Sequence, residues 1–259
     1  MSAYIQKFQI SSRDTDPGNR IRADAITGYM MEAAGRHADV WGMSLPALQA
    51  ENRTWVLARL AARFYDRPGW KSEISVETWS RGFRGFPALR DFLVEGPNGL
   101  VARGCSVWFI LDLSTRKPVR LDGYTERGPA LPDKTAGIPE PGKIPAVDRW
   151  ERETRIQVRS SDLDMNGHVN NVYYLDWTYE AVPPEVLSGM RIRDVVVHYT
   201  AETFYPEAVL SRCSPDPRGG ISADGDEAPI PGTRGFVHSL VRASDGVEVI
   251  KARTTWTPV

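Results

Sequence analysis

An acid, an amide and an imidazole recur at every second residue in one polar stretch of the second half of the chain. They are Asp164, Asn166 and His168. A spacing of two lets all three side chains lean toward one side of an extended or turning segment. Such a set can hold a carbonyl group and deliver a water molecule to it, which is the chemistry of acyl-group hydrolysis. Taken alone, the cluster is equally typical of an Asx-rich turn that caps a helix.

A helical periodicity begins directly after this stretch. Val172, Leu175 and Tyr179 recur at intervals of three and four residues, which predicts an amphipathic helix that runs toward the prolines at 183–184. The first N–H groups of a helix are unpaired and carry partial positive charge. We therefore expect the amides near 170–172 to stabilise an oxygen that gains negative charge.

The same plan occurs once earlier in the chain. The polar stretch around Asp16 also precedes a helical pattern, and an offset of 148 residues relates Asp16 to Asp164. The same offset relates Trp108, near the end of the first half, to Trp256 near the end of the second. The chain is therefore interpreted as a duplicated unit.

The first copy lacks the side chains for proton transfer. In this register Gly18 stands where Asn166 does, and Arg20 stands where His168 does. We expect the first half to supply structure and a pocket, and the second half to carry the chemistry.

Composition limits the class of protein. A chain of 259 residues with 41% hydrophobic content can bury one large core or two ordinary ones, and the repeat favours two. A net charge of −1 provides no overall field for nucleic acid or an anionic membrane. Two cysteines without CxxC spacing fit a reducing compartment. With no apolar run of membrane-spanning length and no signal-peptide pattern at the start, we expect a soluble cytoplasmic protein without a membrane span or a nucleic-acid partner.

Each half reads as one helix with several strands. In the first half we expect a helix at 24–40 and strands at 8–12, 54–65, 74–79, 89–95 and 100–112. In the second half we expect the helix described above and strands at 154–158, 194–204, 208–214, 235–243 and 247–257. A helix followed by antiparallel strands predicts an α+β fold in which a sheet wraps around a helix.

Two segments rich in proline or glycine interrupt this plan. Residues 122–148 contain five prolines and few periodic apolar positions, so we interpret them as a linker between domains at 1–121 and 149–259. Residues 215–232 are rich in glycine, proline and aspartate, which predicts a mobile surface loop.

Several longer motifs support a resemblance to a known family. In the first half they are Thr54-Trp55-Val56-Leu57-Ala58-Arg59, Trp70 with Val76-Glu77-Thr78-Trp79, Arg90-Asp91, and Ser106-Val107-Trp108 with Leu113-Ser114-Thr115-Arg116. In the second half they are Ser161-Asp162-Leu163-Asp164 through Asn166, His168-Val169-Asn170-Asn171, and Tyr174. With these motifs nearly the whole chain resembles the acyl-acyl-carrier-protein thioesterases of the bacterial type, which release free fatty acids during fatty-acid synthesis.

The resemblance implies a fold, a substrate and a set of site residues. It implies a tandem (double) hot-dog, with two antiparallel sheets each wrapped around a long helix, and an acyl carrier protein bearing a phosphopantetheine-linked acyl chain as the partner. It places Asp164, Asn166 and His168 on catalytic positions, and Glu202 on a further one. It implies no cofactor and no metal.

One departure from the family concerns the nucleophile. Plant members carry a cysteine directly after the glutamate, and this chain has Thr203 there. Cys105 lies in the half without the imidazole and Cys213 lies ten positions beyond Thr203, so neither is a convincing substitute. Water is therefore the expected nucleophile.

The roles follow as a hypothesis. We expect Glu202, on a strand facing the second helix, and His168 to share activation of the water, without deciding which accepts the proton. Asn166 would position the water or hold the carbonyl, and Asp164 would orient Asn166 or His168.

Other chemistry-bearing residues have simpler interpretations. His37, His198 and His238 are expected to be structural, because no second ligand at metal spacing accompanies them. Met30, Ala34 and Trp55 are most simply core, and the family resemblance alternatively places them along an acyl tunnel that binds substrate. Four arginines are by default exposed charges, with the acidic carrier protein or its phosphopantetheine phosphate as alternative partners; they are Arg20, Arg22, Arg191 and Arg193.

The sequence leaves two other functions open. One is a thioesterase that acts on acyl-coenzyme A, and the other is a non-catalytic acyl-binding hot-dog protein in which the polar turn is a remnant. A hot-dog hydratase is less expected. Acyl chain length, saturation, and the choice between monomer and homodimer also stay open.

Overall fold

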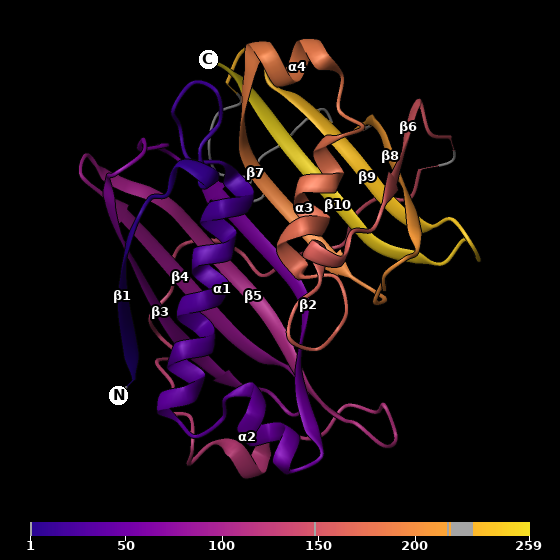
Figure 1. Cartoon of the computed structure of the whole chain (residues 1–259). Helices are drawn as coiled ribbons and strands as arrows, with labels where there is room; N and C mark the ends of the chain where they lie inside the picture. The colour runs from indigo at the N-terminus through magenta and orange to yellow at the C-terminus, as the bar shows by residue number, and fades with distance from the viewer. Residues whose placement is uncertain (1, 148, 217, 219–229) are drawn as a thin grey trace. The chain divides into compact units, whose positions relative to one another are not determined.

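The structure is a computed structural model that describes residues 2–147, 149–216, 218 and 230–259 (Figure 1). The chain divides into two compact units, unit 1 (Met1–Pro141) and unit 2 (Gly142–Val259). Most of the loop predicted at 215–232 lies outside the described residues. Every helix in the described part of the chain is too short or too polar to cross a membrane.

Unit 1 packs one long helix on a set of antiparallel strands. Its elements are β1 (Ala3–Gln9), the 3-10 turn η1 (Ser12–Asp14), α1 (Ala23–Val40), α2 (Leu45–Ala50), β2 (Arg53–Phe64), β3 (Glu73–Phe83), β4 (Ala88–Gly96), β5 (Gly99–Asp112) and η2 (Asp122–Tyr124). The strands pair in the order β1-β3-β4-β5-β2, all antiparallel. Helix α1 lies along one face of these strands and contacts β1 and β3 (Figure 1).

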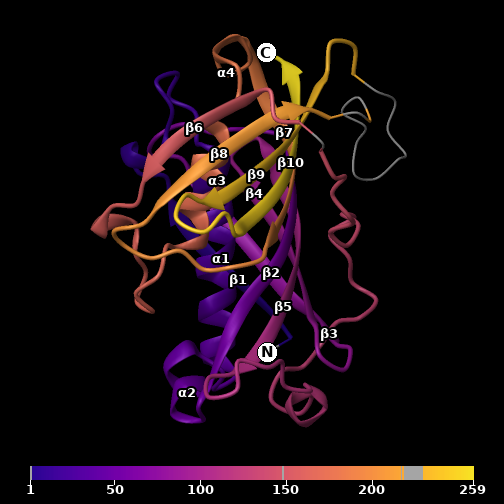
Figure 2. The ribbon, with the colours of Figure 1, turned by 90° about the vertical axis from the view of Figure 1, so that its right-hand side faces the viewer.

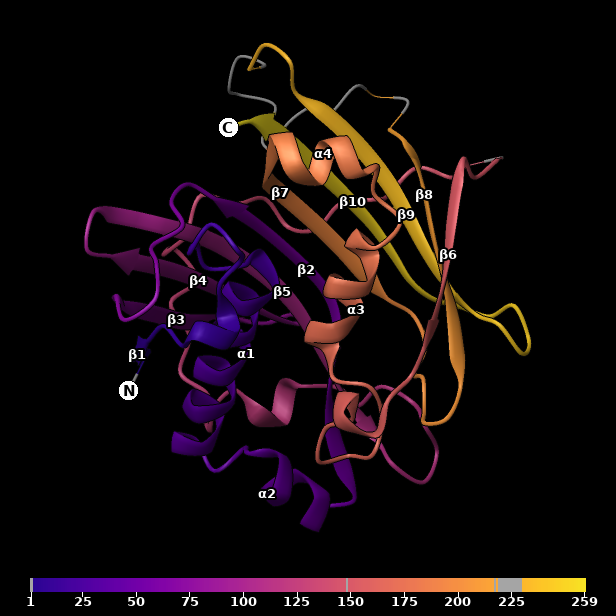
Figure 3. The ribbon, with the colours of Figure 1, turned by 45° about the horizontal axis from the view of Figure 1, so that its top comes forward.

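Unit 2 repeats this plan with a shorter helix. Its elements are β6 (Arg152–Gln157), η3 (Ser160–Asp162), α3 (Asn171–Tyr179), α4 (Pro184–Gly189), β7 (Met190–Tyr199), β8 (Ala208–Pro215), β9 (Arg234–Arg242) and β10 (Glu248–Pro258). The strands pair in the order β6-β8-β9-β10-β7, all antiparallel. Helix α3 contacts β8 and β9 (Figure 3).

The internal duplication is confirmed by corresponding elements in the two units. The strand order of unit 2 reproduces that of unit 1 element by element. The isolated bridge Thr15–Ile21 of unit 1 recurs in unit 2 as Leu163–Val169, at the same offset of 148 residues. Turns η1 and η3 are also 148 residues apart.

The tryptophans that suggested the duplication have matching hydrogen bonds. The indole N–H of Trp108 donates to Ser106 Oγ, and that of Trp256 donates to Thr254 Oγ1, each at 2.8 Å. The two halves therefore correspond in side-chain contacts as well as in strand order.

Most predicted elements are present, with shifted ends. The helix predicted at 24–40 is confirmed as α1, and its buried side chains include Ile26, Met30, Ala33, Ala34 and His37. The first strand lies earlier than predicted, because the chain leaves β1 after Gln9 and enters η1 at Ser12. Helices α2 and α4 were not predicted, since six residues are too few to show a helical period.

The helix of unit 2 ends earlier than its apolar pattern suggested. Helix α3 stops at Tyr179, and the chain turns so that the N–H of Val182 donates to the carbonyl of Tyr179 at 2.9 Å. Ala181 and Val182 are buried in that turn. The prediction of a long helix in this half is therefore wrong, because buried turn residues continued the apolar periodicity.

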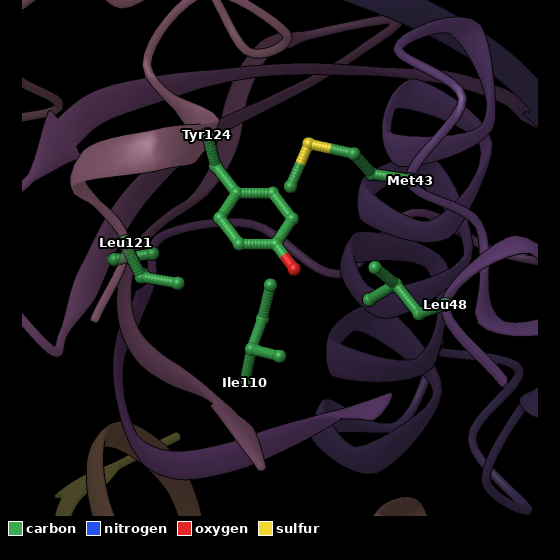
Figure 4. Close-up of a cluster of buried hydrophobic side chains, with 6 residues drawn as sticks. Met43, Leu48, Ile110, Leu121 and Tyr124 are labelled. Carbon is green, nitrogen blue, oxygen red and sulfur yellow. The ribbon is translucent and has the colours of Figure 1, made fainter. Parts of the chain in front are cut away.

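A compact apolar cluster closes the α2 end of unit 1. Its buried members are Met43, Leu48, Ala88, Ile110, Leu121 and Tyr124 (Figure 4). The partly buried Trp55 packs against them. Trp55 also donates its indole N–H to the carbonyl of Met43 at 2.9 Å. Leu121 and Tyr124 thus hold the start of the proline-rich segment, residues 122–148, against this cluster.

The part of the proline-rich segment that belongs to unit 1 continues along the face of that unit's strands that lies away from α1 (Figure 2). The Trp79 indole donates to the carbonyl of Lys134, and the N–H of Ala136 donates to Asp91 Oδ2, each at 2.8 Å. Ala136 and Ile138 are buried. Residues 131–138 therefore pack on the strands of unit 1 and belong to that unit, although they contain no helix or strand.

Candidate active site

The polar stretch of unit 2 folds into a tight turn between η3 and α3. The bridge Leu163–Val169 closes its base. Inside it, the N–H of Asp164 donates to the carbonyl of His168 at 2.9 Å, and the N–H of Gly167 donates to the carbonyl of Asp164 at 3.0 Å. Gly167 has a φ of +79°, a conformation that a glycine adopts without strain. The turn thus presents Asp164 and His168 together.

His168 lies between two carboxylates. Its Nδ1 is 3.4 Å from Asp164 Oδ2, and its Nε2 is 3.8 Å from Glu202 Oε1. The side chains of all three residues are partly exposed, at 25% for His168, 21% for Asp164 and 33% for Glu202. The structure therefore brings together three of the four predicted site residues, in a position that water can reach.

Asn166, the fourth predicted residue, lies at the exposed tip of the turn. Its backbone N–H donates to Asp164 Oδ1 at 2.8 Å. The Asp164 carboxylate thus supports the turn with one oxygen and faces His168 with the other, an arrangement that can orient the imidazole.

Glu202 does not lie on a strand, so that prediction is wrong. Strand β7 ends at Tyr199, because the N–H groups of Thr200 and Ala201 both turn to the carbonyl of Val249, at 3.0 and 3.3 Å. The chain then runs through an irregular segment, residues 200–207, to β8.

Two backbone contacts hold this irregular segment beside the turn. Arg242 Nη1 donates to the carbonyl of Glu202 at 3.0 Å. The N–H of Val169 donates to the carbonyl of Thr203 at 2.9 Å. These bonds bring Glu202 next to His168, although 34 residues of sequence separate them.

The predicted oxyanion donors at the start of α3 are largely engaged inside the protein. The N–H of Asn170 donates to the carbonyl of Asp162 at 2.9 Å, and that of Val172 donates to Asn170 Oδ1 at 3.1 Å. The second bond is an ordinary N-cap. The amides of Asn170 and Val172 are therefore already bonded, one to a backbone carbonyl and the other to the N-cap, and the prediction that these two stabilise an oxyanion is wrong.

Aromatic and apolar side chains that are not among the predicted site residues flank the imidazole. The Phe204 ring meets the His168 ring edge to face, with centroids 6.4 Å apart. Phe204 and Tyr205 are exposed, as is Met165 within the turn itself. The sequence predicts Phe204 at the end of a strand at 194–204, so the only local signal for this apolar border is the aromatic pair, Phe204 and Tyr205, that closely follows Glu202.

Unit 1 forms the same turn without an imidazole. The N–H of Asp16 donates to the carbonyl of Arg20 at 2.8 Å, and the N–H of Asn19 donates to the carbonyl of Asp16 at 2.9 Å. The backbone of the turn is therefore a feature of both halves, and the side chains distinguish the candidate site.

The remaining histidines have contacts of a structural kind. His37 and His238 are fully buried, with Nδ1 of His37 3.1 Å from Arg90 Nη1 and Nε2 of His238 2.8 Å from Thr254 Oγ1. His198 Nε2 lies 2.8 Å from the carbonyl of Gly142. Among the described residues no group of three or more histidine, cysteine, aspartate or glutamate side chains is arranged to hold a metal ion.

Both cysteines are buried free thiols. Burial raises the pKa of the Cys213 thiol to about 12. Burial, together with the Asp91 carboxylate, raises the pKa of Cys105 as well. A thiol with such a pKa is almost entirely protonated at neutral pH, which agrees with water as the nucleophile.

The residues considered for an acyl tunnel lie in unit 1. Met30 is fully buried, with its sulfur beside the backbone of Gly104, and Ala34 follows one turn later on α1. Trp55 is half-buried at the apolar cluster of Figure 4. These contacts show core packing.

Three of the four arginines considered for a carrier protein lie beside a neighbouring carboxylate. Arg20 Nε is 3.3 Å from Asp16, Arg22 Nη2 is 3.0 Å from Asp24, and Arg193 Nε is 4.0 Å from Asp194. The Arg193 side chain is largely buried, at 13% exposure, so it is not the exposed charge that was expected. Arg191 is exposed.

Two family models match the chain. The model described as the acyl-ACP thioesterase N-terminal domain matches residues 1–125, and that described as the acyl-ACP thioesterase C-terminal domain matches residues 147–258.

Curated relatives are plant enzymes. The oleoyl-acyl carrier protein thioesterase of Coriandrum sativum is 26% identical over 98% of this chain and 76% of its own length. The palmitoyl-acyl carrier protein thioesterase of Cuphea hookeriana is 27% identical over 98% of this chain. The chain spans only 62% of that relative's length.

Solved structures with the same fold cover both units. An acyl-ACP thioesterase from Bacteroides thetaiotaomicron superposes with a TM-score of 0.82 at 24% identity, covering 99% of this chain and 98% of its own. The 12:0-ACP thioesterase from Umbellularia californica superposes with a TM-score of 0.80 at 23% identity, covering 99% and 94%. At these identities the superpositions establish the fold.

Proposed function

The chain belongs to the acyl-ACP thioesterase family, and from that premise we propose that it hydrolyses fatty acyl-acyl carrier protein to a free fatty acid and the carrier protein. Members of this family are thioester hydrolases. The observation that supports a working site in this chain is the position of His168, whose two ring nitrogens face the carboxylates of Asp164 and Glu202.

The proposed reaction uses water as the nucleophile. Glu202 and His168 together remove a proton from a water molecule, whose oxygen attacks the thioester carbonyl carbon. The carbonyl oxygen gains negative charge in the tetrahedral intermediate, and the Asn166 side chain is the proposed donor to it. The C–S bond then breaks, and the proton held by the site passes to the departing thiolate.

Asp164 has a supporting role in this proposal. An anionic partner at Nδ1 fixes the ring orientation and stabilises the imidazolium that forms when His168 takes a proton. The 3.4 Å separation of Asp164 Oδ2 from Nδ1 fits that role.

The two units are proposed to be a tandem hot-dog with divided roles. Residues 1–121 would form the acyl-binding hot-dog, 122–148 the connecting segment, and 149–259 the catalytic hot-dog. The matching strand orders support this division, as does the occurrence of an imidazole in only the second of the two turns. Met30, Ala34 and Trp55 are the proposed contacts of the acyl chain, supported by their apolar surroundings in unit 1.

The function is tested by offering the purified chain a ladder of acyl groups of increasing length on acyl carrier protein and identifying the released acids. We expect free acid from the wild-type chain and at least roughly a hundredfold less from His168→Ala. Offering the same acyl groups on coenzyme A separates the two carriers. Binding of acyl carrier protein without acid release would instead indicate a non-catalytic acyl-binding protein.

A further inference from the structure

Two buried hydroxyl groups lie next to each other beside the candidate site. Tyr174 is on α3, and Thr203 directly follows Glu202 in the chain. Tyr174 is 2% exposed and Thr203 is 0% exposed. The backbone and the hydroxyl of Thr203 are close enough to the Tyr174 phenol to act on its pKa as hydrogen-bonding groups. The two residues therefore connect the helix that follows the catalytic turn to the segment that carries Glu202.

The hydroxyl groups of this pair lack hydrogen-bond partners among the described residues. Within the residues that the structure describes, neither Tyr174 Oη nor Thr203 Oγ1 makes a hydrogen bond of normal geometry. A buried hydroxyl without a partner is costly. A small approach of the Thr203 segment toward α3 would satisfy both groups with one bond.

The phenol is a proton donor at neutral pH. Burial, opposed by the hydrogen-bonding groups of Thr203, raises the pKa of Tyr174 to about 12, and the carboxylates of Glu202 and Glu207 contribute to the rise. A protonated phenol can donate to Thr203 Oγ1, and the threonine hydroxyl can accept while keeping its own proton.

The corresponding positions of unit 1 show that the fold does not need these hydroxyls. An offset of 148 residues places Ile26 of α1 at the position of Tyr174, and Ile26 is fully buried. Both positions are therefore interior, but only the one in unit 2 carries a polar atom.

A shared backbone bond identifies the counterpart of Thr203. The N–H of Ile21 donates to the carbonyl of Pro68 at 3.0 Å, as the N–H of Val169 does to the carbonyl of Thr203 at 2.9 Å. Pro68 has no side-chain donor or acceptor. The hydroxyl pair thus occurs in the unit that carries His168 and lacks a counterpart in the unit that does not.

Glu202 is the group whose position this pair can control. Its Oε1 lies 3.8 Å from His168 Nε2, beyond hydrogen-bond length. Glu202 lies in an irregular segment. Its position therefore depends on the contacts of neighbouring residues and not on the hydrogen bonds of a strand. A shift of a few tenths of an ångström to one ångström at Thr203 is enough to decide whether the two groups share a proton.

We propose that Tyr174 and Thr203 are positioning residues, whose hydroxyls hydrogen-bond in the substrate complex and thereby hold the Glu202 carboxylate at hydrogen-bond distance from His168. This inference rests on the proposed function. Neither residue touches the reacting atoms, and the effect on turnover passes through Glu202.

The test is a double-substitution cycle with Tyr174→Phe and Thr203→Val, measured on an acyl-acyl carrier protein that the wild-type chain hydrolyses. We expect each substitution to lower kcat roughly tenfold with KM within about twofold, and the double variant to be no slower than either single one. Thr203→Ser, which keeps the hydroxyl, should restore most of kcat. Tyr179→Phe is the matched control, because it removes a hydroxyl from the same helix at a ring that packs on Trp256.

The outcomes separate the possibilities. Wild-type kcat in Tyr174→Phe, multiplied losses in the double variant, or a Thr203→Ser variant as slow as Thr203→Val would each overturn the inference. If Tyr174→Phe does not fold, the comparison of Thr203→Ser with Thr203→Val decides. A wild-type chain that releases no acid would overturn the proposed function itself, and this inference with it.

Discussion

Arg20 of unit 1 stands at the position that His168 occupies in unit 2. Its Nε lies 3.3 Å from Asp16 Oδ2, whereas His168 Nδ1 lies 3.4 Å from Asp164 Oδ2. The same turn thus holds a permanent cation in one half and a titratable imidazole in the other. Because arginine keeps its proton at any physiological pH, the turn of unit 1 cannot serve as a general base.

Asp164→Asn is expected to lower kcat roughly a hundredfold while the chain stays folded. The amide oxygen can still accept the N–H of Asn166, but the charge that orients the His168 ring and stabilises its protonated form is lost. Steady-state kinetics on acyl-acyl carrier protein measure the effect, and circular dichroism checks the fold.

Asp16→Asn provides a control for this substitution at the corresponding position of unit 1. It perturbs an equivalent turn, in which Asp16 Oδ1 accepts the N–H of Arg20 at 3.0 Å. We expect kcat within about twofold of wild type. A comparable loss in the two variants would mean that the carboxylate acts through folding of the turn, and Asp164 would have no special role.

Glu202→Gln is expected to reduce kcat by roughly a hundredfold or more with a small change in KM, because glutamine keeps the size of the side chain but cannot accept a proton from water. Glu248→Gln is a suitable control in the same unit, since Glu248 accepts from Ser239 and lies 3.5 Å from Lys251. Near-normal turnover of a folded Glu202→Gln variant would leave His168 as the only candidate base.

The sequence predicted which residues come together at this site better than it predicted the local backbone structure around them. The offset of 148 residues located the turn, the helix and the tryptophan contacts in both halves, because buried apolar positions and hydrogen-bonded turns leave periodic patterns. Glu202 was misplaced on a strand, since the apolar and β-branched residues around it do not reveal that two amides converge on Val249.

Contacts between segments distant in the chain could not be predicted at all. The path of residues 200–207 brings Thr203 close to Tyr174, and it brings the Phe204 ring against His168 edge to face. No local spacing encodes that route. The same is true of residues 131–138. They belong to the stretch 122–148, whose five prolines suggested a linker, but tertiary hydrogen bonds hold them to Trp79 and Asp91.

Met30→Ala tests the proposed acyl contacts. The substitution removes most of a fully buried side chain beside Gly104. The free energy of unfolding should therefore fall by about 2–5 kcal/mol. If the acyl chain lies against α1, the new space should also raise kcat/KM for longer acyl groups relative to shorter ones. Leu240→Ala makes a similar cavity at a fully buried position of unit 2. Equal changes in chain-length preference in the two variants would contradict the assignment of the acyl pocket to unit 1.

His238 should make the stability of the protein depend on pH between about 6.5 and 3. Burial lowers the pKa of this histidine from 6.5 to about 3, and its Nε2 lies 2.8 Å from Thr254 Oγ1. As the pH falls below 6.5, the unfolded chain takes up a proton that the folded chain still refuses. The free energy of unfolding therefore falls with decreasing pH, by up to about 1.4 kcal/mol per pH unit from this group.

Urea unfolding at a series of pH values, compared between the wild type and His238→Gln, isolates the contribution of this residue. The wild-type chain should lose more stability than the variant between pH 6.5 and pH 4, and the two curves should run parallel above pH 7, where His238 is neutral in both states. Carboxylates also titrate in the acid range, but they are common to the two proteins and cancel in the difference. Parallel curves over the whole range would show that protons reach the His238 ring in the folded chain, and would contradict its burial on β9.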